Sequence, residues 1–73
     1  MQRYAIVIEK GPTNYGAYVP DLPGCVAAAK TKERVERLIK EAIAFHIEGL
    51  KRDGDPIPKP AAQVHYLEVS ISA

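Results

Sequence analysis

The pattern of hydrophobic and polar positions predicts one long amphipathic helix between Thr31 and Asp53. Apolar side chains recur there at steps of three, four and seven residues, which places them on one face of a helix. Thr31 is a suitable N-cap, because its hydroxyl can accept a hydrogen bond from a free backbone N–H of the first turn. Gly54 and Pro56 end the pattern. The residues predicted on the apolar face are Val35, Leu38, Ile39, Ala42, Ile43, His46 and Leu50.

Four short runs of β-forming residues surround this helix. Residues 2–9, 15–19 and 25–29 precede it, and residues 63–71 follow it with alternating apolar and polar side chains. The link between the first two runs is short and contains glycine, which predicts an antiparallel hairpin. The element order is therefore β-β-β-α-β, and we expect a proline-rich, extended link between the helix and the last strand.

These elements predict an α+β fold, a two-layer sandwich with a four-stranded mixed sheet and one helix on one face. The helix forms a right-handed crossover, so the last strand runs parallel to the first. The strand at 2–9 carries the larger aliphatic side chains and is expected in the centre of the sheet. The predicted strand order is 3-2-1-4, with the strand at 25–29 on an edge.

One helix can cover only one face of such a sheet. We predict Tyr4, Ile6 and Ile8 toward the helix, and Ala5, Val7, Ala17 and Val19 on the uncovered face. An apolar patch of this size on a small domain usually marks a partner surface, and the edge at 25–29 has no charge to prevent pairing with another chain. The sequence therefore predicts a homo-oligomer, most simply a dimer, through this face or this edge. The predicted interface residues are Val7, Val19, Cys25, Val26 and Ala27.

Composition sets the remaining bounds. The chain has 73 residues and a net charge of +1, which indicates one domain and argues against a strongly acidic or basic partner. A single cysteine cannot form an internal disulfide, which suits a reducing cytoplasm. Neither a signal peptide nor an apolar run long enough to span a membrane is present in the sequence, so a cytoplasmic protein is expected.

The residues with reactive side chains do not form a recognisable catalytic or metal site. His46 on the helix could act as an acid–base or a metal ligand, but a core histidine is favoured, because no nearby carboxylate or second histidine completes a site. Cys25, His46 and His65 could meet around a metal ion, yet they lack the short spacings of structural zinc sites. Cys25 has no local base to activate it as a nucleophile. We predict no metal and no cofactor.

Phosphodiester chemistry and nucleic-acid binding are also disfavoured. Glu9, Asp21 and Glu68 are spread over different elements, whereas a two-metal nuclease needs converging carboxylates. The basic residues of the helix stand four positions from glutamates, which indicates ion pairs on a solvated face. The predicted pairs are Lys32–Glu36, Glu33–Arg37, Glu36–Lys40 and Arg37–Glu41.

The segment Tyr18-Val19-Pro20-Asp21-Leu22-Pro23-Gly24-Cys25 resembles the hallmark corner of the HicB-like antitoxin family. The similarity covers nearly the whole chain and continues through Thr31, Glu41-Ala42, His46, Leu50 and the proline-bearing exit at 54–60. The chain departs from the family at Ala29-Lys30, where members commonly carry Gly-Asp, and in the charged first helical turn, Lys32-Glu33-Arg34.

The resemblance implies a partial ribonuclease H-like fold without its catalytic carboxylates, and a role as antitoxin. Such domains bind and block a small HicA-type toxin, an RNA-cleaving protein with a double-stranded-RNA-binding-like fold. Many members carry a second, C-terminal domain that binds operator DNA. This sequence stops at Ala73 after the predicted last strand, so we expect a single HicB-like domain over 1–73, no DNA-binding domain and no direct nucleic-acid partner.

Two functions therefore stay open. One is an antitoxin that captures a HicA-type toxin by protein–protein contact, and the other is an oligomeric scaffold or interaction protein of the same fold without a toxin partner. An enzyme is not expected. For partner binding, the candidates predicted to be exposed are Tyr18, Asp21 and Leu22.

Overall fold

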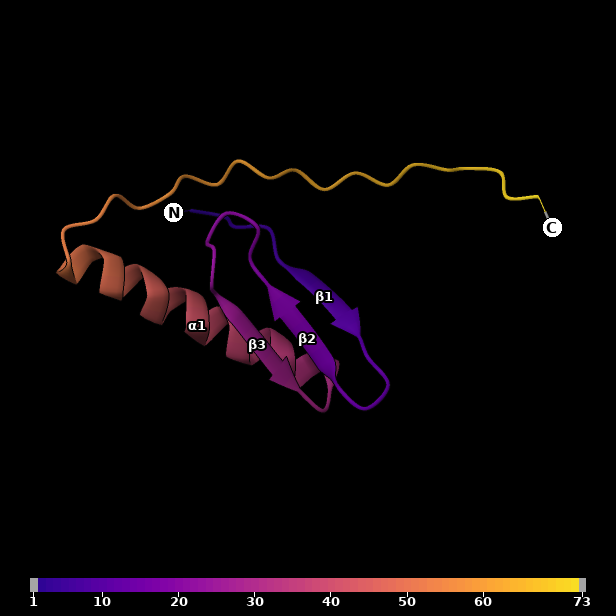
Figure 1. The fold of residues 1–73 in the computed structure, drawn as a ribbon, viewed down its shortest axis with the longest axis horizontal. Coiled ribbons are helices and arrows are strands. Elements are labelled where there is room, and N and C mark those ends of the chain that lie inside the picture. The colour runs from indigo at the N-terminus through magenta and orange to yellow at the C-terminus, as the bar shows by residue number, and fades with distance from the viewer. Residues whose placement is uncertain (1, 73) are drawn as a thin grey trace.

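The computed structural model describes residues 2–72 and contains two layers, a three-stranded sheet and one helix (Figure 1). The strands are β1 (Val7–Lys10), β2 (Tyr15–Tyr18) and β3 (Val26–Ala29), and the helix is α1 (Lys32–Arg52). Both strand pairs are antiparallel, in the order β1-β2-β3. The prediction of an α+β fold with one helix on one face of a sheet is confirmed.

The register of the sheet decides which residues face the helix. Ala17 of β2 lies between Ile8 of β1 and Ala27 of β3. Directly paired residues share a face of a sheet, and Ala17 is buried in the core. This row therefore faces α1, whereas the neighbouring row, centred on Tyr18, faces away.

Helix α1 begins and ends as its sequence predicts. The Thr31 side-chain oxygen accepts a hydrogen bond from the Arg34 backbone N–H at 3.1 Å, so Thr31 is the N-cap. At the other end, Gly54 adopts φ +73°, and its N–H donates to the Lys51 carbonyl at 3.1 Å. Glycine suits this left-handed position because it has no Cβ to clash. The helix packs mainly against β3 and β2 and least against β1.

The core lies between the helix and the sheet. Its buried members are Ala17, Val19, Leu22, Cys25, Val35 and Ile39. Tyr4, Ile6 and Ile8 pack against this core as predicted. The placement of Ala17 and Val19 on the uncovered face is wrong. Ala17 pairs with Ile8 in the row that faces the helix, and Val19 is buried in the core.

The predicted fourth strand is the main error. Residues 63–71 are extended but pair with no strand, so the sheet has three strands among residues 2–72. The predicted fourth strand, and its parallel pairing with the first, are therefore missing from the predicted 3-2-1-4 order. We call residues 63–71 the C-terminal arm. It runs past the N-terminal residues and projects beyond the sheet (Figure 1). Alternation shows that a segment could form a strand, but a strand also needs an edge with which to pair.

The outer face of the helix is solvated. The ion pair found among the described residues joins Lys51 Nζ and Glu48 Oε1 at 3.9 Å, and the four predicted pairs in the first half of α1 are not formed. Exposed pairs of this kind contribute little to stability. Among residues 2–72, no helix combines the length with the apolar content that crossing a membrane requires.

Candidate partner-binding surface

The corner, residues 19–25, connects β2 to β3 through three backbone hydrogen bonds. The Val19 N–H donates to the Cys25 carbonyl at 3.2 Å, the Leu22 N–H to the Val19 carbonyl at 3.1 Å, and the Cys25 N–H to the Leu22 carbonyl at 3.1 Å. Gly24 takes φ +86°, which residues with a Cβ rarely adopt. This tight path turns the Leu22 side chain inward, where it is fully buried.

The three predicted partner-binding residues therefore lie in three different environments. Tyr18 is exposed on the sheet face away from the helix. Asp21 is half-buried and bonded within the chain. The prediction that Leu22 is exposed is wrong: a leucine between two prolines suggests a surface loop, but the corner folds it into the core.

Asp21 attaches the residues just before the C-terminal arm to the corner. One of its carboxylate oxygens, Oδ2, accepts hydrogen bonds from the backbone N–H groups of Ala61 and Ala62, each at 3.0 Å. Sequence reasoning missed this contact because backbone donors leave no signature in residue identity. An aspartate in a turn commonly accepts backbone hydrogen bonds, and here the donors come from far along the chain.

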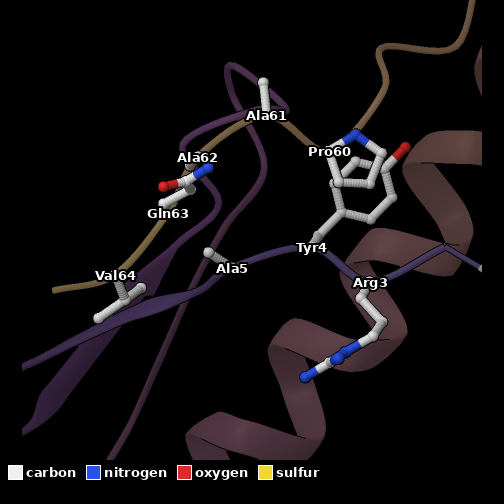
Figure 2. A pocket seen from close by; sticks show the side chains of 8 residues that line it. All are labelled: Arg3, Tyr4, Ala5, Pro60, Ala61, Ala62, Gln63 and Val64. Carbon is white, nitrogen blue, oxygen red and sulfur yellow. The ribbon is translucent and has the colours of Figure 1, made fainter.

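Tyr4 makes a second attachment nearby. Its hydroxyl donates a hydrogen bond to the carbonyl oxygen of Pro58. Figure 2 shows the Tyr4 ring beside the Pro60 ring, at one end of a shallow pocket between the N-terminal segment and the exit from the helix. The pocket lining consists of Arg3, Tyr4, Ala5, Pro60, Ala61, Ala62, Gln63 and Val64. These contacts hold the chain through Ala62, and among the described residues none of the same kind is found for 63–72.

The uncovered sheet face carries a short apolar row. Val7, Tyr18 and Val26 are paired across the three strands, and Tyr18 and Val26 are 42% and 64% exposed. Glu9, Gly16 and Ala28 form the next row on this face. A row with an aromatic residue at its centre is a suitable binding surface for another protein.

Of the residues predicted for an oligomer interface, some lie on the uncovered face of the sheet and the others face the helix or the core. Val7 and Val26 lie on the uncovered face, whereas Ala27 belongs to the row that faces the helix. The side chains of Val19 and Cys25 are buried in the core of their own domain and are not part of the free surface. The alternation of apolar and polar residues could not distinguish the exposed residues from the buried ones. The corner interrupts the alternation, so inward-facing positions before and after it do not follow one period of two.

Cys25 and the two histidines lie in different surroundings. Burial raises the pKa of the Cys25 thiol, which disfavours the reactive thiolate. His46 is half-buried on α1, while His65 lies in the exposed arm with Nε2 3.0 Å from Gln63 Oε1. Within residues 2–72, no group of three or more His, Cys, Asp or Glu side chains is placed to hold a metal ion.

Comparisons with known proteins agree with these features. The family model described as HicB_like antitoxin of bacterial toxin-antitoxin system matches residues 4–70. An uncharacterized 14.9 kDa protein of Haemophilus phage HP1 is 46% identical over 64 residues, which cover 88% of this chain and 48% of the phage protein. A UPF0150 protein of Thermoplasma acidophilum is 40% identical over 62 residues, which cover 84% of this chain and 90% of that protein. This chain thus spans about half the length of its phage relative.

A solved structure has the same fold. A chain of the "HicA3 and HicB3 toxin-antitoxin complex" superposes with a TM-score of 0.70 at 37% identity, covering 82% of this chain and 70% of that chain. An antitoxin family and a neighbour taken from a toxin–antitoxin complex indicate a binding protein and not an enzyme. The family match over residues 4–70 and the shared fold lead to one conclusion: this chain belongs to the HicB-like antitoxin family.

Proposed function

We propose that this protein is an antitoxin that neutralises a small HicA-type, RNA-cleaving toxin by direct protein–protein contact. The observation that carries the proposal is the likeness to a chain of a solved HicA3–HicB3 complex, at 37% identity over most of the chain. The sequence match to the HicB-like family supports it independently of the structure.

The row Val7–Tyr18–Val26 is the surface we propose for this contact. It is apolar, its members Tyr18 and Val26 are exposed, and its three residues are paired across the three strands. Tyrosine is enriched among the residues that contribute most to binding, because it buries a large area with few rotatable bonds and keeps a polar tip. We therefore propose Tyr18 as the central contact and retain Asp21 as a residue that acts through the position of the arm.

Further features follow from the same proposal. An RNA-cleaving toxin acts where messenger RNA is translated, so the cytoplasm is the proposed site of action. The partial ribonuclease H-like architecture, which the family resemblance implied, stays a prediction, and so does the absence of direct nucleic-acid binding. The alternative function, a scaffold of this fold without a toxin partner, is the outcome if no toxin is bound.

The experiment is co-expression of the chain with a HicA-type toxin encoded beside its gene, with growth as the first readout and affinity by calorimetry as the second. Wild type should restore growth. Tyr18→Ala should weaken binding at least about tenfold, the loss typical of truncating a central aromatic contact. The matched control is Phe45→Ala, because Phe45 is an aromatic side chain, 76% exposed, on the helix layer.

The outcomes separate the two functions. No rescue and no binding by the wild-type chain would contradict the antitoxin proposal and favour the scaffold. Rescue that is lost equally in Tyr18→Ala and Phe45→Ala would retain the function and contradict the proposed surface. For Asp21→Ala we expect weaker capture of the toxin with a smaller effect on folding.

A further inference from the structure

The C-terminal arm exposes a large apolar surface to water, which is thermodynamically unfavourable. Its five large apolar side chains are 60–93% exposed. They are Val64, Tyr66, Leu67, Val69 and Ile71. Contiguous apolar surface of this kind marks a segment that binds another surface.

The dimensions of the molecule show the same excess. Its accessible surface is 6244 Å², about 1,800 Å² more than the roughly 4,450 Å² expected for a compact protein of 8.0 kDa. The radius of gyration is 14.7 Å, against about 11 Å for a compact chain of this length. The longest dimension is 53 Å and the other two are 27 and 19 Å, because the arm projects past the sheet (Figure 1).

The same chain carries an incomplete edge. Strand β1 is an edge strand, and helix α1 packs least against it. Ile6 and Ile8 face the helix but are only half-buried, unlike Ala17 beside them. One more strand next to β1 would pair its free N–H and C=O groups and cover these side chains.

We propose that two copies of this chain form a dimer in which each C-terminal arm adds a strand to the other copy's sheet beside β1. The arm's own alternation fits the position, because Leu67, Val69 and Ile71 share one side and can face the helix layer next to Ile6 and Ile8. The part of this edge that the pocket leaves uncovered, residues 6–10, has five residues, so the nine-residue arm is long enough to pair along it.

The attachment of the arm explains why its partner is a second copy. Asp21 and Tyr4 fix residues 58–62, and the prolines at 56, 58 and 60 stiffen the approach. Gln63 and Val64 still line the pocket with Tyr4 and Ala5 (Figure 2), and the rest of the arm then extends past the sheet (Figure 1). When two copies exchange identical arms, each copy makes the same contacts, and the assembly is a closed dimer.

The area involved is sufficient for a stable dimer. An excess of about 1,800 Å² per copy gives roughly 3,600 Å² for a pair, within the range of about 2,000–5,000 Å² that obligate homodimers bury. The proposal does not depend on the antitoxin function, because it concerns this chain alone and is tested without toxin.

The test is the molar mass of the purified chain by size-exclusion chromatography with light scattering at micromolar concentration. We expect twice the 8.0 kDa mass of one chain for the wild type. The double variant Leu67→Ser, Ile71→Ser should give the mass of one chain and keep the circular dichroism of α1. Phe45→Ser is the matched control, because it removes an equally exposed side chain from the helix and should remain a dimer.

A monomeric wild type would overturn the proposal, and so would a dimer that persists in the double variant. If the double variant does not fold, hydrogen exchange of the wild type decides. Protection of the amides of residues 66–71 that increases with protein concentration is expected. Protection that is independent of concentration, or no protection at all, contradicts the exchange of arms.

Discussion

The corner and the C-terminal arm are similar in sequence character and opposite in structure. Each is a short stretch with apolar residues and prolines in or just before it: the corner contains Pro20 and Pro23, and prolines 56, 58 and 60 precede the arm. In the corner, Leu22 is fully buried and three backbone hydrogen bonds fix its path. In the arm, Leu67 is 86% exposed and the backbone pairs with no strand.

The difference teaches that apolar content alone does not place a residue in the core of its own chain. The corner is connected to two paired strands, so its side chains are carried to the helix by short, fixed geometry. The arm is separated from the sheet by a stiff, extended link. Its burial then depends on a partner, and for this chain we propose a second copy.

The largest expected effect comes from truncating the leucine of each region. Leu22→Ala should lower the free energy of unfolding by about 2–5 kcal/mol at every protein concentration, because it leaves a cavity in the core. Leu67→Ala should have an effect only where copies associate. Urea denaturation at several protein concentrations measures both, and equal losses in dilute protein would mean that the arm is buried within its own chain.

The next effect tests the backbone of the corner. Gly24→Ala should cost about 1–2 kcal/mol, because φ +86° forces a Cβ against the following carbonyl oxygen. Gly16→Ala is the control, since a Cβ there meets nothing within 4 Å and φ is ordinary. Thermal unfolding of both variants measures the difference. Equal melting temperatures would show that the turn at Gly24 is not held in this conformation.

A smaller effect concerns the link between the two regions. Asp21→Ala removes the acceptor of the Ala61 and Ala62 amides, a loss of about 1 kcal/mol for a partly exposed, charge-assisted pair. Hydrogen exchange at these two amides should become roughly fivefold faster. Asp55→Ala is the control, because no hydrogen bond of its side chain is found among the described residues. Unchanged exchange in Asp21→Ala would mean that the two amides have another acceptor.

The smallest effect is the pH dependence from Cys25. Burial raises the pKa of its thiol above the ordinary value of 9.0, so the unfolded chain loses this proton first as pH rises. The contribution to stability is fully present below that pH and declines above it. Alkylation by iodoacetamide should be slower in the folded protein than in urea at each pH, and Cys25→Ala should remove the decline. Equal alkylation rates would contradict the burial.

The sequence predicted those elements that depend on local signals. The N-cap at Thr31, the apolar positions Val35 and Ile39 and the stop at Gly54 are all properties of neighbouring residues, and α1 follows them. The family was also predictable, because the corner motif and the proline-bearing exit occur together.

What failed depends on contacts between distant residues. The face of the sheet on which Ala17 lies is set by the pairing register with β1, which no pattern within β2 reveals. Leu22 is buried because the corner folds back on itself. The arm looks like a strand by composition, but nothing in its own residues states which edge, or which copy of the chain, it pairs with.

The most direct test of the account is a nuclear Overhauser experiment on a mixture of isotope-labelled and unlabelled chains, filtered for contacts between copies. The exchange of arms predicts contacts between the methyl groups of Leu67 or Ile71 in one copy and those of Ile6 or Ile8 in the other. Contacts of the same pairs within a single copy, with none between copies, would contradict it.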